Sequence, residues 1–178
     1  IIITVGFLME DATKAAAKQN PEEKFAIVDA AGDPELDNMK GLLFNTAQSS
    51  FLAGYLAAGM SETGKVATFG GLPIPSVTAF MDGYWEGVQY YNQENGTDVQ
   101  VLGWDMNQPG GGSFAGGFED QAKGQQLARN FIQQGADIVF PVAGPVGLGA
   151  AQEAQTTGKA SIIWVDSDGY VSVPQFKG

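Results

Sequence analysis

Residues 63–88 read TGKVATFGGLPIPSVTAFMDGYWEGV, and this stretch decides the fold class. Its apolar run 65–69 predicts a buried strand that ends at Gly70-Gly71. A segment of helical periodicity follows, and Ser76 is of the residue type that caps helix N-termini, so we expect a helix from there to about residue 92. One face of that helix carries Phe80, Tyr84 and Val88. A strand followed directly by a helix is half of a strand-helix-strand unit.

The same alternation extends in both directions along the chain. We expect strands at residues 1–5, 25–30, 65–69, 99–104, 137–143 and 161–165, and helices at 11–19, 46–60, 76–92, 120–134 and 147–157. Asp11 is positioned to cap the first of these helices. The near-continuous apolar character of the strands, beginning with a buried strand at 1–5, is typical of a parallel sheet. The sequence therefore predicts an α/β protein with a doubly wound parallel sheet and flanking helices.

The first part of the chain differs from the rest. Residues 32–38 contain Asp33-Pro34 and have no periodicity, so we interpret them as a crossing between two lobes. We expect residues 1–37 to be a remnant of an N-terminal lobe plus the crossover, and residues 38–178 to form a largely complete C-terminal lobe that is the ligand-binding half. Because the chain opens within a strand, we expect an N-terminal portion to be missing.

Composition excludes several functions. The 178 residues include 20 acidic and 9 basic side chains, a net charge of −11, and such a surface repels nucleic acid. Histidine and cysteine are both absent, which excludes histidine-dependent nucleophilic triads, thiolate or histidine zinc sites and dithiol redox centres. No stretch approaches the roughly 20 apolar residues of a membrane helix. We expect no catalytic residues, no metal and no cofactor.

Two glycine-rich stretches resemble nucleotide-binding motifs without meeting their requirements. Residues 59–66, GMSETGKV, approach the phosphate-binding loop, but Val66 lacks the hydroxyl that holds magnesium and the segment leads into a strand. We interpret it as a turn that ends a helix. Residues 110–115 have the spacing of a dinucleotide fingerprint, but no helix starts there. We interpret the surrounding loop, 108–117, as a flexible surface loop, with a lid over a ligand as the alternative.

Candidate ligand contacts lie in the loops that follow the strands, because ligands of such sheets bind at the carboxyl ends of the strands. The sequence Asp166-Ser167-Asp168 suits the binding of paired hydroxyls, a magnesium ion or the cap of a turn, and we favour hydroxyls. Several aromatic residues also lie near strand ends, where a flat ligand could stack on them. For any one of them core packing is the more frequent role. Those closest to a strand end or a helix start are Phe7, Phe80 and Phe140.

At the level of longer stretches the chain resembles the basic membrane protein family, also called purine nucleoside receptor A-like proteins. The resemblance is carried by VGFLMEDA (5–12), FAIVDA (25–30), SFLAGYLAA (50–58), residues 63–88, GFEDQAKG (117–124), QGADIVFPVAGPVGLGAAQEA (134–154) and IIWVDSD (162–168). These stretches occur in the family's order and cover essentially the whole chain. The loop at 108–117 is longer than is usual in the family.

The resemblance implies a type I periplasmic binding protein fold that binds a purine nucleoside in the cleft between two lobes and delivers it to an ABC permease. The expected ligand-binding residues are Phe7, Asp11, Phe80, Phe140, Gly144, Gly147, Asp166 and Asp168. Phe7 and Phe140 would line the cleft beside the base, Asp11 and the loop 144–147 would hydrogen-bond the nucleoside, and Asp166 would bind the ribose hydroxyls.

The resemblance also implies an extracytoplasmic protein, a monomer at full length, anchored by lipid on an N-terminal cysteine that this sequence does not contain. Two other functions stay open at this point. One is the ligand-sensing domain of a regulator or a signalling receptor, for a sugar or a nucleoside. The other is a metal-dependent nucleotide-sugar enzyme that uses Asp166 and Asp168.

Overall fold

The computed structural model describes residues 1–177, apart from the side chain of Pro109. Gly178, the last residue of the predicted second lobe, lies outside the described residues. The chain divides into two compact units, Ile1–Asn45 and Thr46–Gly178. Within residues 1–177, no helix combines the length and the apolar character that a membrane crossing requires.

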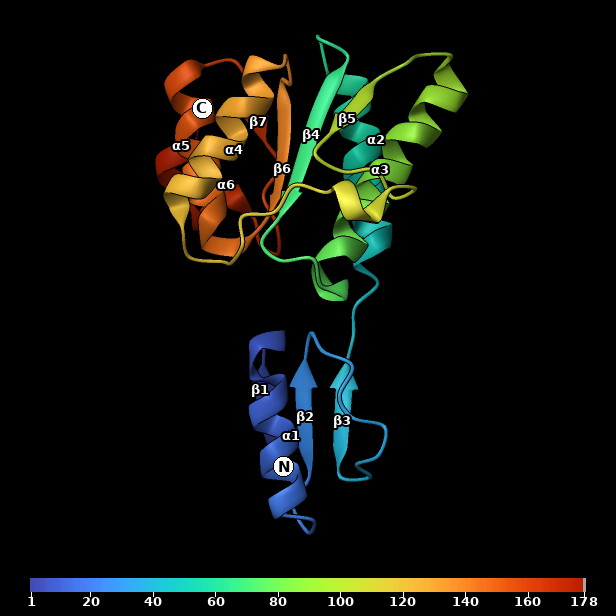
Figure 1. The fold of residues 1–178 in the computed structure, drawn as a ribbon, viewed down its shortest axis with the longest axis vertical. Helices are drawn as coiled ribbons and strands as arrows, with labels where there is room; N and C mark the ends of the chain where they lie inside the picture. Colours follow the sequence, from blue (N-terminus) through green and yellow to red (C-terminus); the bar gives the residue numbers. More distant parts are fainter. Residues whose placement is uncertain (178) are drawn as a thin grey trace. The chain divides into compact units, whose positions relative to one another are not determined.

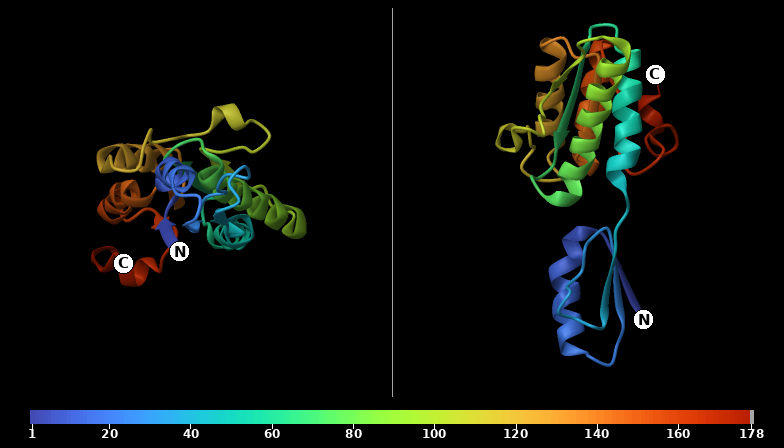
Figure 2. Two further views of the ribbon diagram at one scale, coloured as in Figure 1. Left: turned by 90° about the horizontal axis from the view of Figure 1, so that it is seen from below. Right: turned by 90° about the vertical axis from the view of Figure 1, so that its right-hand side faces the viewer.

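The first unit is a three-stranded parallel sheet with one long helix on it (Figure 2). Its elements are β1 (Ile2–Val5), η1 (Phe7–Met9), α1 (Glu10–Gln19), β2 (Phe25–Val28) and β3 (Met39–Leu42). Phe25 and Ile27 of β2 form the core under α1. β1 is an edge strand whose residues Ile3 and Val5 are 62% and 68% exposed, so the buried strand expected at 1–5 was wrong for this unit.

The structure divides the chain at a different residue from the predicted boundary between the lobes. Residues 39–42 form β3, which pairs in parallel with β2 from Phe25↔Met39 to Val28↔Leu42. The boundary therefore falls after Asn45 and not at residue 37. Residues 32–38 are a connection within the first unit, held in part by the Asn38 side chain, which donates to the carbonyls of Ala17, Asn20 and Glu23.

The second unit contains a four-stranded parallel sheet in the order β5-β4-β6-β7. Its strands are β4 (Lys65–Gly70), β5 (Gln100–Leu102), β6 (Ile138–Val142) and β7 (Ser161–Ile162). The chain adds β5 on one side of β4, then crosses over to place β6 on the other side, so the winding direction reverses between β4 and β6. The doubly wound parallel sheet predicted from the sequence is confirmed.

Helices cover both faces of this sheet (Figure 1). They are α2 (Thr46–Met60), α3 (Pro75–Asn95), α4 (Gln121–Gln133), α5 (Gly147–Thr157) and α6 (Gly169–Ser172), with the 3-10 helices η2 (Pro109–Gly111), η3 (Gly144–Val146) and η4 (Pro174–Phe176). α2 and α3 pack on one face through a core that includes Met81, Tyr84 and Phe140. α4 and α5 pack on the other face, where Phe69 and Val139 are fully buried.

Glycines set the separation of α2 and α3. A Cβ at Gly54 would overlap the carbonyl oxygen of Tyr84, and Cβ atoms at Gly83 and Gly87 would overlap the carbonyl oxygens of Ala47 and Phe51. The two helices thus approach backbone to backbone. No larger residue fits at these contacts. This explains the glycines in the stretch 50–58 and in the second half of the stretch 63–88.

The helix starts differ in detail from the predicted caps. Glu10 is the first residue of α1, and its N-cap is Met9, so Asp11 lies in the first turn and does not cap. Likewise α3 begins at Pro75 after Ile74, and no side chain caps it. Proline is favoured at the first helical position, and since the helix already begins at Pro75, Ser76 lies inside its first turn and is not the N-cap.

Candidate ligand-binding site

The carboxyl edge of the second sheet is the place where a ligand of this fold binds. All four strands run in parallel, so the segments that follow them emerge at the same edge. At the reversal point the amide of Gly71, after β4, donates to the carbonyl oxygen of Val142 at the end of β6, at 2.9 Å. The helices on either side of this point lie on opposite faces of the sheet, and in such sheets this is where ligands bind.

The loop after β6 is shaped by two of the predicted residues. Gly144 has φ +50°, a conformation that favours glycine, and a Cβ there would meet no atom within 4 Å. Gly147 begins α5 and is buried, close to Pro141 and Trp164. Between them η3 forms a tight turn that leads the backbone from the strand into the helix. The turn thus brings the amides at the start of α5 to the carboxyl edge.

Asp166 and Asp168 follow β7, the neighbour of β6, but have different environments. Asp168 is the N-cap of α6 and accepts a hydrogen bond from the amide of Tyr170 at 2.9 Å. Asp166 has φ +64°, an uncommon conformation for a residue with a side chain. In the described part of the chain its carboxylate has no hydrogen bond and no ion pair. Of the roles considered for this sequence, capping is thus performed by Asp168. The Asp166 carboxylate is available to a ligand.

The electrostatic environment of Asp166 is also unusual. The residue is exposed as a whole, yet the protein around its carboxylate displaces part of its hydration, and this burial raises the pKa above the ordinary value for aspartate. Among the described residues no cationic side chain forms an ion pair with it to offset this effect. Among residues 1–177, no group of three or more acidic side chains is arranged to hold a metal ion.

The two aromatic residues predicted in this unit differ in their exposure. Phe140 is 3% exposed, and its ring centroid lies 5.2 Å from that of Tyr84 in the core. Its carbonyl oxygen accepts a hydrogen bond from Thr68 Oγ1 at 2.8 Å. Phe80 of α3 is half-buried and packs against the same core. In this structure Phe140 therefore has the core role that is more frequent for a single aromatic residue, and Phe80 keeps some exposed surface.

Phe7 and Asp11 belong to the first unit. Phe7 begins η1 directly after β1 and is partly buried against the Phe25–Ile27 core. Asp11 is exposed in the first turn of α1. Both lie just beyond the carboxyl end of β1, the position expected for ligand contacts in that sheet. Their roles as ligand contacts stay predictions.

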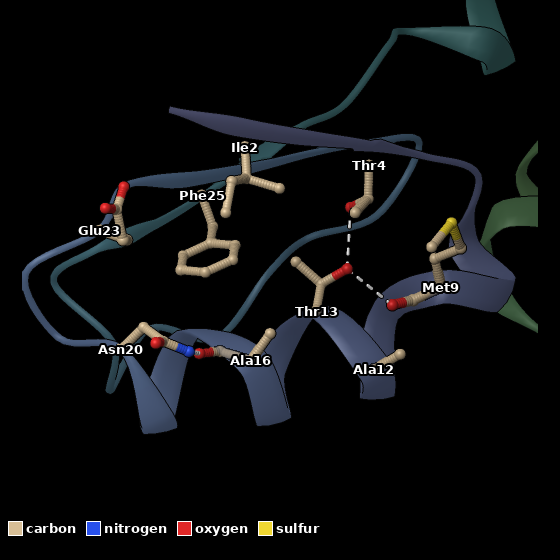
Figure 3. A pocket seen from close by; sticks show the side chains of 9 residues that line it. All are labelled: Ile2, Thr4, Met9, Ala12, Thr13, Ala16, Asn20, Glu23 and Phe25. Atoms are coloured by element: carbon tan, nitrogen blue, oxygen red, sulfur yellow. Dashed lines mark hydrogen bonds between the residues drawn. The ribbon is translucent and has the colours of Figure 1, made fainter.

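A groove of about 460 Å³ in the first unit does not coincide with these residues (Figure 3). It lies between α1 and the strands β1 and β2, and a hydrogen bond of 2.8 Å between Thr4 Oγ1 and Thr13 Oγ1 crosses it. None of the predicted ligand residues lines it. The lining residues are Ile2, Thr4, Met9, Ala12, Thr13, Ala16, Asn20, Glu23 and Phe25.

One residue at a carboxyl edge was missed by the sequence analysis. Asp29 follows β2 and has φ +65°, nearly the value of Asp166. Each aspartate follows a valine at the end of an apolar run, in FAIVDA and IIWVDSD, and this shared pattern was the available signal. Left-handed residues other than glycine concentrate at functional sites, so Asp29 is a further candidate in the first unit.

Comparison with known proteins supports the fold and shows the family. Residues 1–176 match the family described as "ABC transporter substrate-binding protein PnrA-like". The chain is 35% identical to basic membrane protein A of Borreliella burgdorferi over 171 residues, which are 94% of this chain and 47% of that protein. It is 32% identical to the "ABC transporter nucleoside-binding protein BmpA" of Lactococcus lactis over 169 residues, 93% of this chain and 44% of that protein.

A solved structure is similar as well. The crystal structure of an ABC transporter solute-binding protein from Aeropyrum pernix K1 matches with a TM-score of 0.80 at 32% identity, over 98% of this chain and 48% of that one. The chain thus spans about half the length of the relatives it matches.

Parallel α/β units with ligand loops at the carboxyl edges define the class of type I periplasmic binding proteins. Within that class, the chain belongs to the PnrA-like family of ABC transporter substrate-binding proteins. This is a family of binding proteins and not of enzymes, so the nucleotide-sugar transferase considered for Asp166 and Asp168 is excluded.

Proposed function

We propose that the complete protein binds a purine nucleoside and that Asp166 holds the ribose hydroxyls. The observation that carries this proposal is the state of the Asp166 carboxylate, which has no partner within residues 1–177 and a pKa raised by burial. An ionised carboxylate accepts a hydrogen bond from each of two adjacent hydroxyls, the arrangement that the ribose 2′ and 3′ positions present. Such bonds would compensate for the hydration that this carboxylate has lost.

The remaining features of the nucleoside are assigned to neighbouring elements. The exposed part of Phe80 suits one face of a planar base, because aromatic rings stack on one another. The turn at Gly144–Gly147 lies at the same carboxyl edge, so we assign it to hydrogen bonds with the base or the sugar. A relative described as nucleoside-binding supports this ligand class, and purine is our choice within it.

The family description implies a small-molecule ligand and a permease as partners. We further propose that the complete protein works outside the cytoplasm as a monomer, anchored through a lipidated N-terminal cysteine that these 178 residues do not include. It would pass the nucleoside to the permease of its own transporter.

A ligand panel tests the proposal on the complete protein. Thermal unfolding is followed with inosine, guanosine, adenosine and free ribose. A ligand that binds only the folded protein stabilises it by about 2.7 kcal/mol at a concentration of 100 times Kd, so binding appears as a rise in Tm. We expect a rise with at least one purine nucleoside and a smaller one with ribose. If no nucleoside raises Tm, the proposed ligand is wrong.

The substitution Asp166→Asn tests the role of this residue. Asparagine tolerates the left-handed backbone but accepts fewer hydrogen bonds, so we expect nucleoside affinity to fall about ten- to a hundredfold. In the absence of ligand, the substitution is expected to stabilise the folded protein. A carboxyl whose pKa is raised by folding destabilises the fold above its unfolded pKa, so removal of the charge is expected to raise Tm slightly at pH 7.

The matched control is Asp98→Asn, at an exposed aspartate before β5 on the amino side of the sheet. It removes the same charge away from the carboxyl edge, and we expect nucleoside affinity to be unchanged. Equal losses of affinity in both variants would point to net charge and contradict the assignment of Asp166.

A further inference from the structure

The glycine-rich segment after β5 is attached to the end of β4. Its Ser113 carbonyl oxygen accepts from the amide of Gly70 at 3.0 Å, and the amide of Ala115 donates to the Gly70 carbonyl oxygen at 2.9 Å. Gly116 and Gly117 both donate to the carbonyl oxygen of Gly71. The segment thereby forms a parallel bridge, Gly70↔Phe114, that continues the sheet beyond β4. In Figure 1 it is the yellow loop between β5 and α4.

Aromatic rings of this segment lie directly on glycines. A Cβ at Gly70 would come within 2.8 Å of the Phe114 ring, and one at Gly71 would overlap the ring of Phe118. A Cβ at Gly112 would come within 2.5 Å of the Trp104 ring. The rings and the backbone of the strand end therefore fit together without space for any other residue at these three glycine positions.

One polar contact ties the assembly to α3. Trp104 is 5% exposed, and its Nε1 donates to Asp82 Oδ1 at 2.9 Å. Its ring meets that of Phe114 edge to face, with centroids 6.0 Å apart. A continuous series of contacts thus leads from Asp82 through Trp104 and Phe114 to Gly70, beside the reversal point of the sheet. The flexible loop expected at 108–117 is in fact anchored over its second half.

We propose that Trp104 is a positioning residue for the ligand site. Through Phe114 it holds the backbone at Gly70-Gly71 in place, so that the segment acts as a fixed wall of this site and not as a lid. This role rests on the proposed function in one respect, because nucleoside affinity is one of the two quantities that test it. Trp104 would thus influence nucleoside affinity without contacting the nucleoside.

Trp104→Phe tests the proposal in the complete protein, because phenylalanine keeps an aromatic ring and removes the hydrogen bond to Asp82. We expect the amides of Gly70 and Ala115 to exchange with deuterium about tenfold faster or more, since a bond to a charged acceptor is lost. We expect affinity for the nucleoside that stabilises the wild type to fall about tenfold. Gly110→Ala, in open space at the tip of the loop, is the control and is expected to change neither quantity.

Two substitutions of Asp82 separate positioning from general loss of structure. Asp82→Asn keeps an oxygen acceptor for the indole, whereas Asp82→Ala removes it, so we expect only the alanine variant to reproduce the effects of Trp104→Phe. Unchanged exchange at Gly70 in Trp104→Phe, or equal effects of both Asp82 variants, would overturn the proposal. The exchange measurement needs no ligand, so it remains decisive if no nucleoside binds and the proposed function fails.

Discussion

Gly87→Ala is the most direct test of the packing described above. Gly87 lies inside α3, where α3 crosses α2. An added Cβ would overlap the carbonyl oxygen of Phe51 and lie 2.8 Å from the amide nitrogen of Tyr55, both of them backbone atoms. Backbone atoms within a helix cannot rotate away as a side chain can. The two helices would have to move apart, and the core that they share would open.

Two effects of opposite sign decide the size of the change. Alanine in place of glycine inside a helix stabilises the helix by about 0.5 to 1 kcal/mol. Overpacking of a tight contact typically costs about 1 to 3 kcal/mol, and a contact with rigid backbone belongs at the upper end. We therefore expect a net destabilisation of about 1 to 2 kcal/mol for Gly87→Ala.

Urea unfolding followed by circular dichroism measures this free energy, as a lower midpoint with an unchanged slope. Gly110→Ala makes the same chemical change where no atom lies within 4 Å of the new Cβ, and we expect a change below about 0.5 kcal/mol. If Gly87→Ala is as stable as the wild type or more stable, helix propensity outweighs packing and the close approach of α2 and α3 is refuted.

Two further substitutions test buried polar groups. Tyr84 is fully buried, and its hydroxyl has no hydrogen-bond partner within residues 1–177. Tyr84→Phe should therefore stabilise the protein by about 1 kcal/mol in thermal unfolding, with Tyr90→Phe at an exposed position as the control. A loss of stability would reveal a partner of the Tyr84 hydroxyl. Glu153 is 4% exposed, and its carboxylate accepts a hydrogen bond from Arg129 Nε at 2.9 Å. The interaction with Arg129 lowers the pKa of Glu153 from its ordinary value of 4.5. Its stabilisation is present above pH 4.5 and lost as pH falls toward the lowered pKa, so the Tm difference between wild type and Glu153→Gln should shrink below pH 4.5; a constant difference would contradict this.

The sequence predicted the second unit well because its elements carry strong periodic signals. The stretches 65–69 and 137–143 are long apolar runs, and they became β4 and β6 at the centre of the sheet. The lobe boundary was missed because MKGL, the sequence of β3, is a short strand with one lysine and one glycine. Such a strand is specified by its pairing with β2, a long-range contact that local periodicity does not contain.

The positions of the candidate residues in the fold were predictable, but their environments were not. The order of strands places Asp166 at the carboxyl edge, and the fold rule alone leads to that expectation. Whether a carboxylate there is free or used depends on the backbone that follows. Asp168 caps a helix that begins one residue later, a local contact, whereas burial of Phe140 depends on Tyr84 from another helix. The first could be weighed from sequence, and the second required the assembled core.

Asp29 and Asp166 share a left-handed backbone conformation after strands of the two sheets. A left-handed backbone costs a residue with a Cβ about 1 to 2 kcal/mol, and glycine would remove that cost at either position. Neither position needs the side chain for a helix cap, since α6 uses Asp168 and no helix starts at residue 29. At Asp166 the free-energy cost is larger, because burial also raises the pKa of the carboxyl group and so disfavours its charged form. A carboxylate in such a place lowers stability on two counts, and both are consistent with the ligand role proposed for Asp166.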